Sequence, residues 1–342
     1  MSFKRFDLED VVVSAESVTS PIWSGDKTTL STFFTSSTQV GGTSADYYYN
    51  IFNTGSQQAG SRTQFSLAYA DKKGSGSISF NANVPGKSPS STIYGQYRNL
   101  ILGTEEQDFT FGDINSEHFY VFSIDRARYK EKLLPGTLDL ELKQSGSSAS
   151  LRLTDNSNIV TTTTFTDAGR VYELVTGSLG NLAAGKKNSQ GYTVNSGSYG
   201  KLLPDVGLIL LNGKALDAPY ASGGLDLQTN RGNNVAGENI EKVFDRLNAG
   251  NGSFRIQSEE TVSSNFVFVR ARNSEFNYST NPSLITGSGE LRHDVMINSP
   301  QSFITAVGLY NDNNDLLAVA KLSRPLLKDF TKEALIRIKL DY

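Results

Sequence analysis

The sequence has no cysteine and very little histidine. Its 342 residues include only two histidines, His118 and His293. The missing thiols exclude disulfide scaffolds, thiolate zinc sites, iron–sulfur clusters and cysteine nucleophiles. Two imidazoles are too few for a histidine-rich metal centre. We therefore assign no metal, no cofactor and no catalytic residue, and we expect a protein that is not an enzyme.

Long hydrophobic runs are also missing. The longest one covers about six residues, 206–211, whereas a membrane-spanning helix needs about 20. Residues 1–10 are charged and lack the apolar region of a secretory signal. The net charge of −3 disfavours nucleic acid as a general partner. These features predict a chain that is made in a cytosol and has no membrane partner.

The common catalytic motifs are absent as well. The phosphate-binding, dinucleotide-binding, zinc-protease and serine-hydrolase signatures do not occur. The adjacent acids Glu105 and Glu106, and likewise Glu259 and Glu260, would point to opposite faces of a strand, so neither pair makes a glycosidase dyad. The acidic stretch 311–315 lacks the glycine and glutamate of a calcium loop and favours a hairpin tip. A serine–histidine–aspartate triad stays open, because serine is abundant.

What is present is a pattern of many short strands. Glycine, serine, threonine and asparagine recur about every 8–12 residues, and apolar residues alternate with polar ones between them. We expect a mainly β fold with two β-rich lobes, sandwich-like or barrel-like, and few short helices. A tight Asn212-Gly213 turn should follow the buried strand 206–211. The other expected strands and hairpins are 78–84, 137–155, 264–270, 303–310 with 316–322, and 336–342.

One helix is predicted with a clear apolar face. Ile240, Val243, Phe244 and Leu247 share the spacing of one helix face, which places the helix at residues 238–248, with Gly250 after its end. A turn of helix over 126–132 is a weaker expectation. Polar stretches near 183–200 and 221–237 read as flexible loops or linkers. They lead to four expected regions: an N-terminal arm (1–30), an N-terminal β-rich lobe (31–136), a middle β-rich region with flexible loops (137–236) and a helix-led C-terminal β-rich region (237–342).

Two kinds of residue stand out as candidates for contacts with partners. Basic side chains cluster in two places, and a solvated charged face is the ordinary interpretation of such clusters. Tyrosine runs place at least one ring outward, although packing in the core is their commonest role. The candidate docking residues are Arg126, Arg128, Lys130, Lys132, Arg270 and Arg272, and the candidate exposed aromatics are Trp23, Tyr47, Tyr48 and Tyr49.

The C-terminal third carries a family resemblance. Residues 262–283 (VSSNFVFVRARNSEFNYSTNPS) and 304–326 (ITAVGLYNDNNDLLAVAKLSRPL) resemble segments of virion structural proteins of T4-like, contractile-tailed phages, those of cyanophages especially. Weaker similarity extends to 94–99 and 126–133. The resemblance touches about half the chain and is dense over residues 260–342. It contains no catalytic motif, so it transfers no residue roles.

The resemblance implies a virion protein of the phage tail, made in the bacterial host cytoplasm. We expect a baseplate component that acts as a protein–protein scaffold, with other tail proteins and further copies of itself as partners. A receptor-binding or glycan-binding tail or fibre module is the first alternative, and it would use the exposed aromatics listed above. A neck or other tail-connector protein is the second. An enzyme of the depolymerase type is the least favoured.

Overall fold

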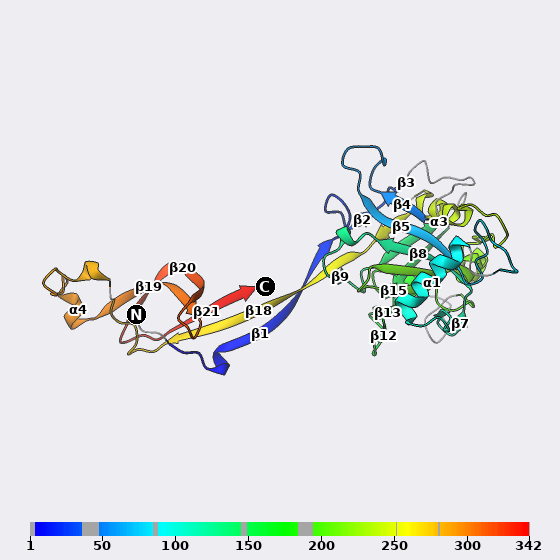
Figure 1. The fold of residues 1–342 in the computed structure, drawn as a ribbon. Helices are drawn as coiled ribbons and strands as arrows, with labels where there is room; N and C mark the ends of the chain where they lie inside the picture. Colours follow the sequence, from blue (N-terminus) through cyan, green and yellow to red (C-terminus); the bar gives the residue numbers. More distant parts are fainter. Residues whose placement is uncertain are drawn as a thin grey trace. The chain divides into compact units, whose positions relative to one another are not determined.

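The computed structural model describes residues 4–35, 48–84, 88–144, 149–183, 194–250, 252–279 and 281–341. The fold is mainly β, with 43% strand and 15% helix, which confirms the predicted class (Figure 1). The chain divides into two compact units. Unit 2 is Val18–Glu260, and unit 1 combines the N-terminal residues up to Ser17 with Thr261 and everything after it. This division differs from the four regions expected from sequence, because strands distant in sequence pair with one another.

Unit 2 is built on one antiparallel sheet of 13 strands. β12 (Thr164–Thr166) and β14 (Asn181–Leu182) pair with β13 outside the main path. From one border to the other, the main path is β2 (Thr29–Leu30), β17 (Ser253–Arg255), β10 (Asp139–Lys143), β11 (Ser150–Asp155), β13 (Gly169–Ser178), β15 (Gly200–Leu203), β16 (Leu208–Asn212), β8 (His118–Ile124), β5 (Thr63–Asp71), β4 (Tyr48–Phe52) and β3 (Phe34–Thr35).

Both faces of this sheet are covered, so strands such as β8 and β16 bury apolar side chains at neighbouring positions. On β8, Val121 packs in the core that includes α1 (Pro89–Leu102). The next residue, Phe122, points to the other face and joins the larger core with α3 (Glu238–Asn248). Successive side chains of a strand point to opposite faces, and each face here has its own apolar layer. The two layers fix the loops at the strand ends, where the polar residues gather.

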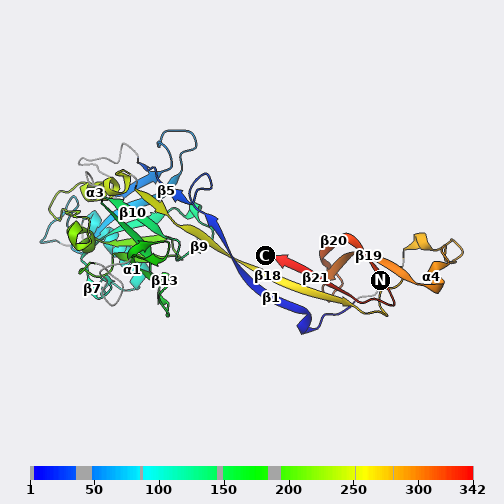
Figure 2. The ribbon, with the colours of Figure 1, turned by 180° about the vertical axis from the view of Figure 1, so that it is seen from behind.

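Unit 1 contains most of a smaller sheet and one long hairpin. The sheet has the order β1 (Val11–Pro21), β18 (Gln257–Ala271), β21 (Ala334–Asp341); the first residues of β18 also pair with β9 (Lys132–Leu133) in unit 2. The hairpin joins β19 (Gln301–Tyr310) to β20 (Leu316–Asp329). Its Leu309 packs with Val267 and Ile338 of the sheet to form a small core. Figure 2 shows β18 beside β1, with β21 next to it.

The remaining elements are short. They are η1 (Leu8–Asp10), β6 (Thr110–Phe111), β7 (Ile114–Asn115), η3 (Arg126–Arg128), α2 (Gly213–Asp217), η4 (Tyr220–Ser222), η5 (Pro282–Leu284) and α4 (Val295–Asn298). None of the helices in the described part of the chain is long and apolar enough to cross a membrane.

Several predicted elements are confirmed. The hairpin over 137–155 forms from β10 and β11, with Leu142 opposite Leu151. The hairpin after residue 303, the strand at 264–270 and the C-terminal strand are present as well. Helix α3 has the predicted bounds and buries Ile240, Val243 and Leu247. Gly250 follows its end with a left-handed φ of 65°.

Other expectations are wrong. Residues 78–84 form turns and not a strand, and Ser79 takes a left-handed φ of 58° there. Asn212 caps the short helix α2, with its side chain accepting from the Lys214 N–H, so no tight turn follows it. The turn of helix expected over 126–132 is confirmed in part, because a single 3₁₀ turn, η3, forms at Arg126–Arg128. Helix α1 was not foreseen, because it buries only Ser90, Tyr94 and Ile101 and has little apolar periodicity.

Candidate functional site

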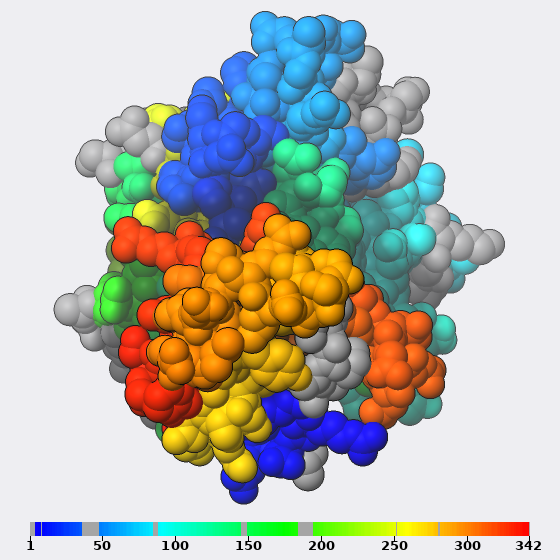
Figure 3. All heavy atoms as spheres, turned by 90° about the vertical axis from the view of Figure 1, so that its left-hand side faces the viewer, coloured from blue at the N-terminus to red at the C-terminus, as the bar shows by residue number. Residues whose placement is uncertain are grey.

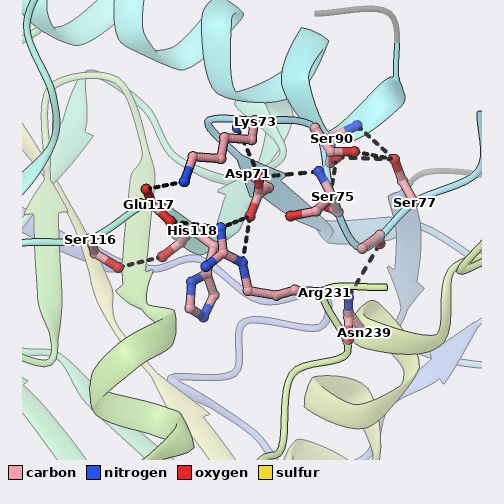
Figure 4. Close-up of polar contacts among 12 residues, drawn as sticks. Asp71, Lys73, Ser75, Ser77, Ser90, Ser116, Glu117, His118, Arg231 and Asn239 are labelled. Atoms are coloured by element: carbon pink, nitrogen blue, oxygen red, sulfur yellow. Dashed lines mark hydrogen bonds and ion pairs between the residues drawn. The ribbon is translucent and has the colours of Figure 1, made fainter. Parts of the chain in front are cut away.

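A cluster of charged residues gathers where β5 ends and β8 begins (Figure 4). Asp71 ends β5 and pairs with His118 at the start of β8. The fully buried Asp71 accepts from Arg231, whose Nε lies 2.9 Å from Asp71 Oδ2. Arg231 Nη2 also donates to Glu117 Oε2 at 3.0 Å, and Lys73 Nζ lies 2.8 Å from the other oxygen of Glu117. The four side chains form a chain of alternating charge in which each carboxylate has a cation.

Asp71 also shapes its own turn. Its Oδ1 accepts the backbone N–H groups of Lys73 at 2.9 Å and Ser75 at 3.1 Å. These bonds give Asp71 partners within its own turn besides Arg231. Hydrogen bonds from Lys73 and Arg231 hold the pKa of Glu117 below its usual value. Glu117 is therefore ionised and paired at neutral pH, which does not suit a general acid.

A second group of contacts surrounds His118. Its Nε2 lies 3.1 Å from Asp217 Oδ2. The other oxygen of Asp217 accepts from the backbone N–H and the hydroxyl of Thr229. Burial opposes charge on Asp217, but the hydrogen bonds from His118 and Thr229 outweigh it and hold the pKa of this carboxyl below its usual value. Ser116 donates its hydroxyl to the backbone carbonyl of His118 and not to the ring, so these three residues are not arranged as a hydrolase triad.

The cavity beside this cluster is very small. Its volume is about 10 Å³, room for a single water molecule, and its lining includes Tyr69, Gly76, Ser77 and Asn239. The Tyr69 hydroxyl has no hydrogen-bond partner among the described residues. Burial raises the pKa of Tyr69, so this phenol is neutral. The space suits one bridging water and no substrate.

The cluster fastens two loops to the sheet. Asn239, at the start of α3, donates to the carbonyls of Gly76 and Asn230 and accepts from the Asn230 N–H. Together with the Arg231 contacts, these bonds hold the loop before α3 against the turn after β5. The polar cluster therefore holds these two loops in position. No group of three or more acidic or histidine side chains suited to a metal ion occurs among the described residues.

The predicted basic residues near η3 are already engaged within unit 2. Arg126 donates to the Tyr129 carbonyl at 2.6 Å and lies over its ring, and Arg128 donates to Ser24 Oγ at 2.8 Å. Lys130 pairs with Glu260, while Lys132 lies 3.5 Å from Glu131 and 4.0 Å from Glu259. These four cations lie in the short segment from η3 to β9, and each of them has a partner within the chain. Their docking role stays a prediction.

The other two candidate basic residues belong to unit 1. Arg270 pairs with Glu333 at 2.9 Å, and its carbonyl accepts from Lys4. The exposed Arg272 contributes its backbone N–H to Glu275. Their docking role is likewise a prediction.

The aromatic candidates separate into buried and exposed rings. Trp23 is buried, donates its Nε1 hydrogen to the Phe254 carbonyl at 3.0 Å and packs on Phe65, so its predicted exposure is wrong. Tyr49 is also buried, and burial raises its pKa to about 12, with Glu241 and Asp245 adding to the shift. Tyr48 is 49% exposed, as predicted. Tyr47 lies outside the described residues. Strand alternation explains the difference, since neighbours on β4 face opposite sides.

An apolar surface in unit 1 was not foreseen. Leu309 and Ala318 of the hairpin face the small core, whereas Leu317 and Val319, on the opposite face of β20, are 68% and 59% exposed. Phe303, beyond the register shift in β19, is 63% exposed. Gly308 lies opposite Val319, and the Tyr310 ring lies over this glycine. The sequence does contain a sign of this surface. Residues 316–320 are all apolar, so both faces of this part of the strand are apolar and neither is polar.

Unit 1 also contains a shallow apolar hollow. Its volume is about 180 Å³, and it is lined mainly by Tyr278, Leu284, Ile285, Leu291 and Met296. Of these residues, Tyr278, Ile285 and Leu291 are exposed. The size is that of one large side chain, which suits a contact with another protein better than a substrate site. No family model, no curated protein and no solved structure matches this chain.

Proposed function

We propose that this protein is a non-enzymatic structural component of a contractile-tailed phage virion, a baseplate component that acts as a protein–protein scaffold. The observation that carries the proposal is the open face of the β19–β20 hairpin, where Leu317 and Val319 are each more than half exposed. Contiguous apolar surface of this kind marks contacts with other proteins. The partners are other tail proteins and further copies of this chain.

The energy of such a contact is substantial. Covering a large apolar side chain contributes about 1.5–3 kcal/mol. The two side chains on the open face, Leu317 and Val319, therefore offer an apolar centre for a protein interface. The hairpin is also weakly supported. It has only two strands, which are marginally stable on their own, and only one of its faces packs against the rest of unit 1. A partner on the open face would stabilise the hairpin as well as bind it.

The family resemblance points to the same region. Its two densest stretches, 262–283 and 304–326, lie in unit 1, and the second one covers most of the hairpin. Unit 2 supplies a large packed body whose polar cluster fastens its own loops. A division into a packed body and an open, strand-rich unit suits a scaffold better than an enzyme.

The test is incorporation into particles. Leu317→Asp places a charge on the open face without altering the small core of unit 1, and Asn313→Asp at the hairpin tip is the matched control. In cells where the variant replaces the natural chain, we expect tail particles to lack L317D and to contain N313D. Normal amounts of L317D in purified particles would refute the proposal. Circular dichroism of the purified variants checks that both are folded.

The alternatives need separate tests. For a glycan-binding module, two of the expected stacking rings, Trp23 and Tyr49, are buried and unavailable. Tyr48 is exposed and could still stack on a sugar. Binding of the purified chain to a glycan array, abolished by Tyr48→Ala, would favour that alternative. Electron microscopy of particles would separate the baseplate from the neck by the position of the density.

A further inference from the structure

Strand β1 borders its sheet with one edge open. It lies next to β18, and the order β1-β18-β21 places no strand on its other side within the described residues. Figure 3 shows the N-terminal segment, in deep blue, open at the surface of unit 1 beside β18 in yellow. An open edge presents unpaired N–H and C=O groups, which are a template for another strand.

The other border strands carry the devices that prevent strand addition, and β1 does not. β2 and β3 have two residues each, and β19 is broken by two register shifts. β21 presents the exposed charged residues Arg337, Lys339 and Asp341. β1 has 11 residues, a single charged side chain (Glu16) and a proline only at its last position. Short length, bulges, charge and proline are the usual protections of an edge.

The first residues of β1 are also uncovered on both faces. Val11, Val12 and Val13 are 36%, 49% and 68% exposed. Because neighbouring residues of a strand point to opposite faces, neither face of this stretch lies against another layer. An added strand would place its own side chains beside these valines on both faces.

The chain around this edge carries more acids than bases. Residues 6–26 contain five acids and no lysine or arginine, and Lys4, Arg5 and Lys27 lie just outside this stretch. Glu16 lies 3.6 Å from Lys339, but no ion pair involves Asp7, Glu9 or Asp10 among the described residues. An excess of carboxylates beside the first residues of β1 favours a basic partner and repels an acidic one.

We propose that the open edge of β1 takes up an extended strand, rich in lysine or arginine, from a neighbouring protein subunit. The proposal rests on the scaffold function above and names a second contact, separate from the hairpin face. Main-chain hydrogen bonds along β1 would supply the affinity, and the valines and acids would select an alternating apolar and basic sequence.

The test uses the whole purified chain and synthetic decapeptides. The probe alternates lysine and valine. The first control alternates glutamate and valine. The second keeps every lysine but replaces two central valines by proline, which removes strand hydrogen bonds and keeps the charge. By fluorescence anisotropy, we expect the proline peptide to bind about tenfold more weakly than the probe and the glutamate peptide not to bind. Equal binding of the two lysine peptides would refute strand addition.

Variants of the chain locate the contact. Val13→Lys should weaken binding of the lysine–valine probe about tenfold, whereas Val13→Glu, equally polar, should retain it. Glu9→Lys should weaken binding, and Glu290→Lys, an exposed acid in another loop of unit 1, is the matched control. If Val13→Lys and Val13→Glu weaken binding equally, the basic character of the partner is wrong. Slowed amide exchange in residues 11–16 with the probe would support the assignment directly.

The outcome for β1 is distinguishable from that for the scaffold role. A second copy of this chain on the edge would appear as a dimer in light scattering that Val13→Lys and Val13→Glu both abolish, and this would overturn the proposal of a different basic subunit. Failure of peptide binding while L317D is still excluded from particles would remove the β1 contact alone. Normal incorporation of L317D would remove the scaffold role through the hairpin.

Discussion

Arg231 donates its Nε hydrogen to Asp71 Oδ2 over 2.9 Å, although the two residues lie 160 positions apart. The bond joins the loop before α3 to the end of β5. Asp71 is fully buried, and Arg231 keeps about a third of its side chain exposed. The pair therefore joins two distant segments of unit 2, with solvent in contact with Arg231 but not with Asp71.

Removing the guanidinium should destabilise unit 2. Arg231→Met keeps the stem but leaves the Asp71 carboxylate without its cation, and we expect a loss of about 2 kcal/mol, less than for a fully buried pair because of solvent screening. Urea unfolding measures the change. The double variant Asp71→Asn with Arg231→Met should recover part of the loss, because no buried charge is then left alone. Simple addition of the two single effects would contradict this coupling.

Gly76 should tolerate no side chain. Its φ is +70°, and an added Cβ would lie 2.7 Å from the Asn230 carbonyl oxygen and 2.8 Å from Asn239 Nδ2. Gly76→Ala combines a strained backbone with these clashes, so we expect a loss of about 3 kcal/mol in the free energy of unfolding. Gly60→Ala is the control: it has a φ of +84° and open space around it, and should cost only about 1 kcal/mol. Equal losses would show that packing at Gly76 is unimportant.

The stability of unit 2 should depend on Asp217 in acid. The folded pKa of this carboxyl lies below its unfolded value, so the folded state binds fewer protons there than the unfolded state. Its stabilising contribution is therefore complete above the unfolded pKa of about 4 and is lost as the pH falls through the folded pKa. Urea unfolding of wild type and Asp217→Asn between about pH 6 and pH 3 should show a difference that shrinks on acidification. A constant difference would mean that the charge of Asp217 does not matter.

Lys328 should be essential to the order of unit 1. Its buried ammonium donates to the Asn273 carbonyl at 3.1 Å, to Asn277 Oδ1 at 2.7 Å and to the Asp329 carbonyl at 2.8 Å. Lys328→Met leaves these oxygens unsatisfied, and we expect a loss of about 2 kcal/mol. Amide exchange should quicken in β19 and β20. The exposed Lys321→Met, on the same strand, is the control and should leave exchange unchanged.

Local patterns were sufficient for several elements. The period-two alternation of Leu138 to Leu142 and of Leu151 to Leu153 predicted a hairpin that forms in register. The spacing of Ile240, Val243 and Leu247 predicted α3 with its bounds. In both cases one face of the element is buried and the other is not, so the periodicity of the residues reports the environment directly.

The candidate sites were less accessible to sequence reasoning. Asp71, Glu117 and Arg231 carry no motif, and they meet only because β5 and β8 are neighbours and the loop before α3 returns to their ends. The sequence suggested that Trp23 and Tyr49 lie on an exposed face. Both rings are instead buried in the larger apolar core that packs on the sheet. The exposed Leu317 reads in sequence like any core leucine.

By itself, then, the sequence determined the β class, the hairpins with one polar face and the one amphipathic helix, because those features depend on neighbours a few residues away. Only the tertiary structure decided which apolar residues are buried, which charges are paired and which strand edge stays open. Those properties depend on the second layer and on the next strand, which come from other parts of the chain, in some cases more than a hundred residues away, as in the pairing of β10 with β17.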